Sequence, residues 1–186
     1  MPSQALVKAS RHLEHARLAF VLCLLPCVLI LPQIFRENLG MSDYGIMALT
    51  IVPYTVGFLL SAYLLCQAAG ELTGKSQSQR VLRKGLYAVA MLQIALLMVP
   101  VIRNDFLRLT HVYIGMTLFA AEGILAIWMQ ARLLRGWTNG ILVLMMAASG
   151  LTAYLSLGNI LKIEALSQLV FQLAFMTLCI RGAKAA

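Results

Sequence analysis

One acidic residue, Glu122, lies deep inside a long apolar stretch, in the segment FAAEGIL. An ionisable side chain is costly in hydrocarbon, and such residues commonly mark ion, proton or ligand sites. An apolar environment also favours the protonated carboxyl unless a cation pairs with it. Glu122 is therefore the first candidate for chemistry. Its candidate hydrogen-bond partners are Gln93, in the middle of the preceding apolar stretch, and Tyr63, Ser149, Thr152, Gln168 and Gln172.

His111 shares a helical stripe with Glu122. With Gly115 and Leu118, the two residues are spaced i, i+4, i+7 and i+11, which places all four along one face of a helix. At 1.5 Å per residue, His111 and Glu122 are about 16 Å apart along the axis. The stripe should face the other helices, and a groove along it could hold a lipid headgroup or relay a proton.

Charged residues gather just before this stripe, at Arg103, Asp105 and Arg108. Together with His111, they could form the mouth of a site, because Arg and His donate charge-assisted hydrogen bonds to anionic oxygens. An ordinary polar loop at the level of the lipid headgroups is the simpler interpretation. An earlier loop with further charges is expected nearby and contains Arg36, Glu37 and Asp43.

Ligands for a metal or haem are scarce. Of the three histidines, His12 and His15 precede the first apolar stretch. The chain contains no HExxH, GxSxG or phosphate-binding glycine loop. We therefore expect no cofactor, no metal and no catalytic residues. A lipid-modifying enzyme with His111 as acid or base stays an alternative.

The composition is that of a membrane protein. The 186 residues are 61% hydrophobic and only 12% charged, whereas soluble proteins carry about 25% charged residues. Six stretches approach the roughly 20 residues needed to cross a bilayer, at residues 18–35, 44–69, 85–102, 109–131, 137–158 and 160–180. We predict an all-α, six-helix transmembrane bundle over residues 18–180, with tails at residues 1–17 and 181–186.

The net charge of +8 follows the predicted topology. Four of the fifteen Lys and Arg residues fall on one side of the membrane, namely Arg36, Arg103, Arg108 and Lys162, and the others fall on the opposite side. The positive-inside rule places both ends of the chain in the cytoplasm. Dispersal of the charge over short loops also argues against nucleic-acid binding, which needs a clustered basic face. A multi-pass cell-membrane protein is expected, in the cytoplasmic membrane if the source is bacterial.

Two segments, residues 41–69 and 99–119, resemble the six-span DRAM-like superfamily and its bacterial relatives of unknown function. The matching positions are Ser42 and Gly45 before the second span, and Pro100, His111 and Phe119 around the fourth. The resemblance covers under a third of the chain. It implies a role in lipid organisation, lipid remodelling or regulation of membrane proteins, and supplies no catalytic residues.

Three functions follow as hypotheses. The first is a lipid-interacting or scaffolding membrane protein with a groove lined by Gln93, His111 and Glu122, whose partners are membrane lipids or another membrane protein. The second is a small proton-coupled carrier in which Glu122 titrates. The third is the enzyme that uses His111.

Overall fold

The computed structural model describes residues 4–35, 39–74, 76–99, 105–157 and 163–186. Within these ranges the chain forms α1 (Gln4–Ile30), α2 (Ile51–Glu71), α3 (Gln77–Met98), α4 (Asp105–Arg132), α5 (Trp137–Leu157) and α6 (Glu164–Ala185), with short 3-10 helices η1 (Pro32–Phe35) and η2 (Met41–Gly45). All six α-helices are long and apolar enough to cross a membrane. The predicted six-span, all-α fold is confirmed, and the chain is an integral, multi-pass membrane protein.

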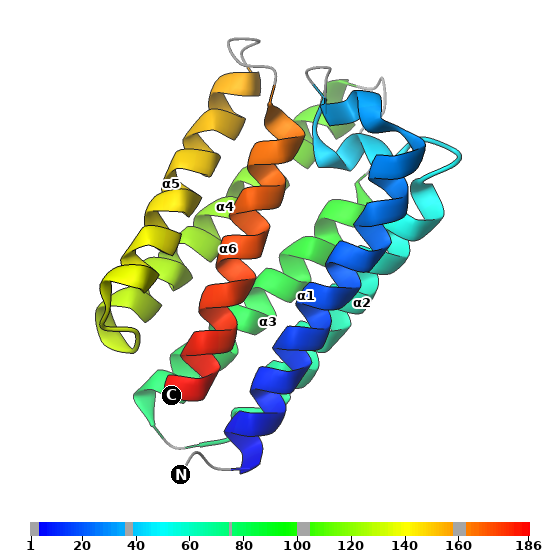
Figure 1. Cartoon of the computed structure of the whole chain (residues 1–186). Helices are drawn as coiled ribbons and strands as arrows, with labels where there is room; N and C mark the ends of the chain where they lie inside the picture. Colours follow the sequence, from blue (N-terminus) through cyan, green and yellow to red (C-terminus); the bar gives the residue numbers. More distant parts are fainter. Residues whose placement is uncertain (1–3, 36–38, 75, 100–104, 158–162) are drawn as a thin grey trace.

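The helices form one bundle in which sequence neighbours mostly pack together (Figure 1). The most extensive pairs are α1 with α2, α5 with α6, and α2 with α3, and α6 also contacts α1, α3, α4 and both 3-10 helices. α1 begins and α6 ends at the same end of the bundle (Figure 1). That arrangement agrees with an even number of spans, while the side of the membrane that this end faces stays a prediction.

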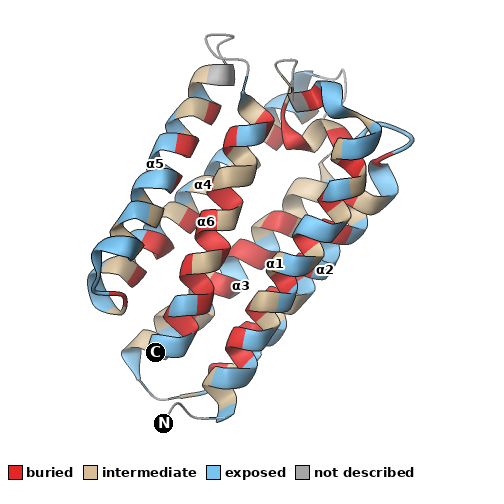
Figure 2. Ribbon diagram, viewed as in Figure 1, coloured by how far each residue is buried: buried red, intermediate tan, exposed pale blue. Residues whose placement is uncertain are grey.

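The last helix is the most buried. In its most apolar stretch of 18 residues, 61% of α6 is buried, compared with 17% for α5 at the periphery. Figure 2 shows buried positions along most of α6 and only one edge of α5. The outward faces carry apolar side chains such as Leu29, Ile124 and Leu144, which are 72%, 69% and 68% exposed. These faces suit contact with lipid.

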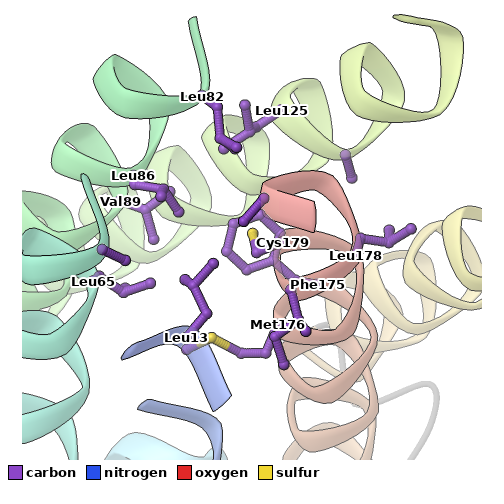
Figure 3. Packing of buried hydrophobic residues seen from close by; sticks show 14 of the residues in the cluster. Leu13, Leu65, Leu82, Leu86, Val89, Leu125, Phe175, Met176, Leu178 and Cys179 are labelled. Atoms are coloured by element: carbon purple, nitrogen blue, oxygen red, sulfur yellow. The ribbon is translucent and has the colours of Figure 1, made fainter. Parts of the chain in front are cut away.

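The core is built from inward-facing residues of several helices. Leu13 of α1, Leu65 of α2, Leu86 of α3 and Phe175 of α6 are each fully buried and belong to one hydrophobic cluster, with Leu125 of α4. Figure 3 shows these side chains converging between the helices. The cluster holds α6 against the first four helices.

The first helix begins earlier than the apolar stretch that predicted it. Residues 4–17, predicted as a tail, are helical because they continue the inward stripe of α1, where Ala9, Leu13 and Ala16 are fully buried. Likewise, α6 extends past residue 180, and Ala183 is fully buried. Whether these ends lie in the membrane or beyond it stays a prediction.

The second helix begins later than predicted, at Ile51 rather than near Tyr44. The Thr50 hydroxyl donates to the Tyr44 carbonyl at 2.8 Å, which closes a turn after η2. Pro53 then falls in the first turn of α2, where a missing N–H removes no helical hydrogen bond.

α1 and α2 approach closely at Gly57. A Cβ atom added to Gly57 would lie 2.6 Å from Cys23 Cβ on α1, a separation that folded proteins do not tolerate. The absence of a side chain at Gly57 is what lets the two backbones pack at this distance, as small residues commonly do in membrane helices.

Candidate functional site in the bundle interior

The predicted stripe of α4 faces inward. His111, Leu118 and Glu122 are 8%, 2% and 0% exposed, whereas Met116 and Ile124 on other faces of the same helix are 46% and 69% exposed. The expectation that this stripe faces the other helices is confirmed. Glu122 is thus enclosed by protein rather than by lipid.

Glu122 pairs with Gln172 across the interface of α4 and α6. Gln172 Nε2 donates to Glu122 Oε2 at 2.8 Å, and Gln172 is only 4% exposed. The second oxygen of Glu122 and the amide oxygen of Gln172 are buried without hydrogen-bond partners in the described part of the chain. The hydrogen bond therefore links α4 to α6, and each of the two side chains keeps one oxygen that can accept a further hydrogen bond.

Two other interior side chains share this property. Gln93 of α3 and Ser61 of α2 are 1% and 0% exposed, and Gln93 Oε1 and Ser61 Oγ lack partners among the described residues. Buried polar atoms are rarely left without partners in folded proteins. Four helices thus each contribute a buried polar group whose hydrogen-bonding capacity is not used up within the described chain.

Of the partners predicted for Glu122, Gln172 is confirmed. Tyr63 is 58% exposed on the outside of α2, and Thr152 donates to Ser167 at 2.7 Å instead. Gln93 is buried as predicted, but no hydrogen bond joins it to Glu122.

Polar side chains recur every four residues along the first half of α6. Glu164, Gln168 and Gln172 span about 12 Å along the axis at 1.5 Å per residue. At the start of α6, Gln168 Nε2 donates to Glu164 Oε1 at 2.9 Å, and Gln168 Oε1 accepts from the Met41 N–H at 2.7 Å. We call Glu164, Gln168, Gln172 and Glu122 the polar ladder. The ladder runs from the start of α6, at the end of the bundle that holds η2, to the interior of the bundle.

Asp43 of η2 lies at the end of the polar ladder where α6 begins. Its Oδ2 accepts from the Gly40 N–H at 2.8 Å, and a Cβ at Gly40 would lie 2.7 Å from Glu164 Oε1. Burial raises the pKa of Asp43, while the Gly40 hydrogen bond and the nearby His111 oppose that shift. Asp43, Glu164, Tyr54 and His111 thus share one electrostatic neighbourhood.

The raised pKa makes stability pH-dependent. The unfolded chain ionises Asp43 near 3.8, whereas the folded protein holds the proton to higher pH. The stabilising contribution of the protonated Asp43 carboxyl is therefore fully present below its pKa in the unfolded chain. It is lost as the pH rises through the raised pKa of the folded protein. We expect the Tm of Asp43→Asn to gain on that of the wild type as the pH rises above about 4.

Thermal unfolding in detergent, followed by intrinsic fluorescence, measures this difference. Asp105→Asn, which removes a carboxylate whose side chain is 86% exposed, is the matched control. A Tm of Asp43→Asn that falls relative to that of the wild type as the pH rises would contradict the prediction.

His111 lies near the start of α4. Its Nδ1 lies at hydrogen-bonding distance from the Val99 carbonyl oxygen, and Asp43 is the acidic group in its electrostatic neighbourhood. The enzyme hypothesis requires a second catalytic group at hydrogen-bonding distance from His111. Among the described residues the imidazole bonds to a backbone carbonyl instead.

The remaining predicted mouth residues are either exposed in the first turn of α4 or lie outside the described residues. Arg108 Nη2 and Asp105 Oδ1 form an ion pair at 3.3 Å within the first turn of α4, with side chains 62% and 86% exposed. Such a pair contributes little to stability. Arg103, Arg36 and Glu37 lie outside the described residues.

Glu164, Gln168 and Gln172 occur at i, i+4 and i+8 in the sequence, a spacing that predicts one helical face. Of these three, only Gln168 and Gln172 are predicted as partners of Glu122, each separately. Within the described ranges, no group of three or more His, Cys, Asp or Glu side chains is placed to hold a metal ion. Comparison with known proteins finds no matching family, curated protein or solved structure. The resemblance to the DRAM-like superfamily therefore stays a prediction.

Proposed function

We propose that the protein is a small proton-coupled membrane carrier in which Glu122 binds and releases the proton. The observation that carries this proposal is a carboxyl group, 0% exposed, at the inner end of a ladder of polar side chains. Ionisable residues inside membrane bundles commonly form proton relays.

The ladder supports a route between Glu122 and one surface. Gln168 and Gln172 provide an amide at each turn between Glu164 and Glu122, on the most buried helix of the bundle. Amide groups both donate and accept hydrogen bonds, so they can orient polar cargo or water along α6.

The unused hydrogen-bonding capacity argues against a purely structural pair. A pair that served only to join α4 and α6 would be expected to satisfy its own polar atoms. Instead, Glu122 Oε1 and Gln172 Oε1 lack partners in the described part of the chain, as do Gln93 Oε1 and Ser61 Oγ. The oxygens of Glu122 and Gln172, which lie beside one another, suit a site that exchanges protons and binds a small polar solute.

A lipid-interacting or scaffolding protein is the second candidate. The placement of His111 and Glu122 on one inward stripe of α4 is compatible with a groove between helices. The DRAM-like resemblance points to the same class.

The test is proton movement in proteoliposomes that contain an entrapped pH-sensitive dye. Candidate solutes are added outside as classes: amino acids, organic acids, sugars and organic cations. At least one class is expected to change the internal pH with the wild type, and Glu122→Gln is expected to reduce this signal to that of empty liposomes, because an amide cannot release a proton.

The matched control is Glu71→Gln, the same substitution at a half-buried glutamate at the end of α2. It is expected to retain the signal. Wild-type flux that persists in Glu122→Gln would exclude the carrier mechanism, as would the absence of proton movement with all four classes.

A further inference from the structure

A cavity of about 360 Å³ lies at the end of the bundle that holds both termini, away from Glu122. It is lined by Leu6, Val7, Ser10, Arg11 and Glu14 of α1 and by Lys184 of α6. The α1 residues are spaced by three and four, so they form one face of that helix. The cavity therefore lies between the first and last helices, at the level of the lipid headgroups for a bundle that spans a bilayer.

The cavity wall carries hydrogen-bond donors and positive charge. Ser10 is 3% exposed, and its hydroxyl has no partner among the described residues. Lys184 Nζ contacts Glu14 Oε1 at 2.9 Å, whereas Arg11 makes no ion pair within the described ranges. Of the side chains that line the cavity, Arg11 and Lys184 are cations and Glu14 is an anion, so the lining carries a net charge of +1. This charge matches the single negative charge of one phosphate diester.

An exposed apolar stripe begins where the cavity ends. Leu18, Leu22, Leu25 and Leu29 are 53%, 56%, 51% and 72% exposed, and their spacing continues the face of Arg11 and Glu14 along α1. From Leu18 to Leu29 the stripe is about 16 Å long. Half of a hydrocarbon core of about 30 Å is about 15 Å, so the stripe matches the acyl region of one leaflet.

We propose that this cavity binds the phosphate headgroup of an anionic phospholipid, whose chains lie along the leucine stripe. Arg11 and Lys184 supply charge-assisted donors to the phosphate oxygens, and the Ser10 hydroxyl supplies a third donor. The stripe is what favours a phospholipid over a soluble phosphate. The proposal does not depend on the carrier function, because it uses none of the residues of the polar ladder.

The test is native mass spectrometry of the full chain in mild detergent, titrated with phosphatidylglycerol or with phosphatidylcholine of the same chain length. The first phosphatidylglycerol is expected to bind more tightly than phosphatidylcholine. Arg11→Gln is expected to weaken that binding about fivefold to tenfold, since hydrogen bonds to charged groups are the stronger class. Ser10→Ala is expected to weaken it about threefold, with no loss of Tm in the delipidated protein.

Lys8→Gln is the matched control, because it removes an exposed cation from the same end of α1 without lining the cavity. If Lys8→Gln and Arg11→Gln weakened phosphatidylglycerol binding equally, the effect would come from net charge alone, and the proposed site would be wrong. Inorganic phosphate that displaces phosphatidylglycerol at equal concentration would identify a soluble anion site and overturn the lipid assignment.

Discussion

Glu122→Ala is expected to lower the free energy of unfolding by about 2–4 kcal/mol, whereas Glu122→Gln is expected to lower it by less than about 1 kcal/mol. Alanine leaves a cavity at a position with 0% exposure and removes the acceptor of the Gln172 Nε2 hydrogen bond. Glutamine keeps both the volume and an acceptor oxygen. Denaturant unfolding of the purified protein in mixed micelles measures these differences.

The control for side-chain removal is Ile124→Ala, two residues along α4 and 69% exposed. It is expected to change stability little. Equal destabilisation by Glu122→Ala and Ile124→Ala would mean that the inward face of α4 does not pack against the other helices as described.

Replacing both partners separates stability from function. The double variant Glu122→Leu, Gln172→Leu removes the hydrogen bond without leaving an unpaired polar atom, so its stability is expected to stay within about 1–2 kcal/mol of the wild type. The single variant Glu122→Leu leaves Gln172 Nε2 buried without its partner and is expected to be the less stable of the two. A stable double variant without proton movement would show that the pair is not needed to hold the fold.

Gly57→Ala is expected to destabilise the protein by about 1–3 kcal/mol, the usual range for overpacking. The new Cβ would lie 2.6 Å from Cys23 Cβ, which is close to the α1 backbone and cannot rotate away. Gly57→Leu is expected to prevent the close packing of α1 on α2 and to yield aggregated protein in size-exclusion chromatography.

Gly123→Ala is the matched control, because a Cβ at Gly123 meets no heavy atom within 4 Å. Both substitutions gain the higher helix propensity of alanine. The difference in unfolding free energy between the two variants therefore measures the cost of the clash alone. Cys23→Gly in the Gly57→Ala background removes the opposing Cβ and is expected to restore part of the stability. Equal stabilities of Gly57→Ala and Gly123→Ala would refute the close approach.

Hydropathy was sufficient to predict the number of helices, since each span is a separate apolar stretch. It could not define helix ends, because α1 gains its first turns from the burial of Ala9 and Leu13 against other helices. Likewise, a side-chain hydrogen bond from Thr50 to the Tyr44 carbonyl closes the turn before α2, and average hydropathy does not register such a bond.

The inward face of α4 was predictable because helical periodicity alone places His111 and Glu122 on one stripe. The partner of Glu122 was not, because the choice between Gln93 and Gln172 depends on which helix packs beside α4 at that depth. The cavity beside Arg11 could not be predicted from the sequence, since it requires Lys184 to lie beside Glu14, 170 positions away in the chain.

The central position of α6 has a consequence for how the bundle is made. Ribosomal synthesis delivers α1 to α5 to the membrane before α6, yet 61% of the most apolar stretch of α6 is buried among them. Until α6 inserts, Glu122 lacks its Gln172 partner. The assembling chain therefore has an incomplete interior until α6 inserts, and the bundle is completed by its central helix rather than nucleated by it.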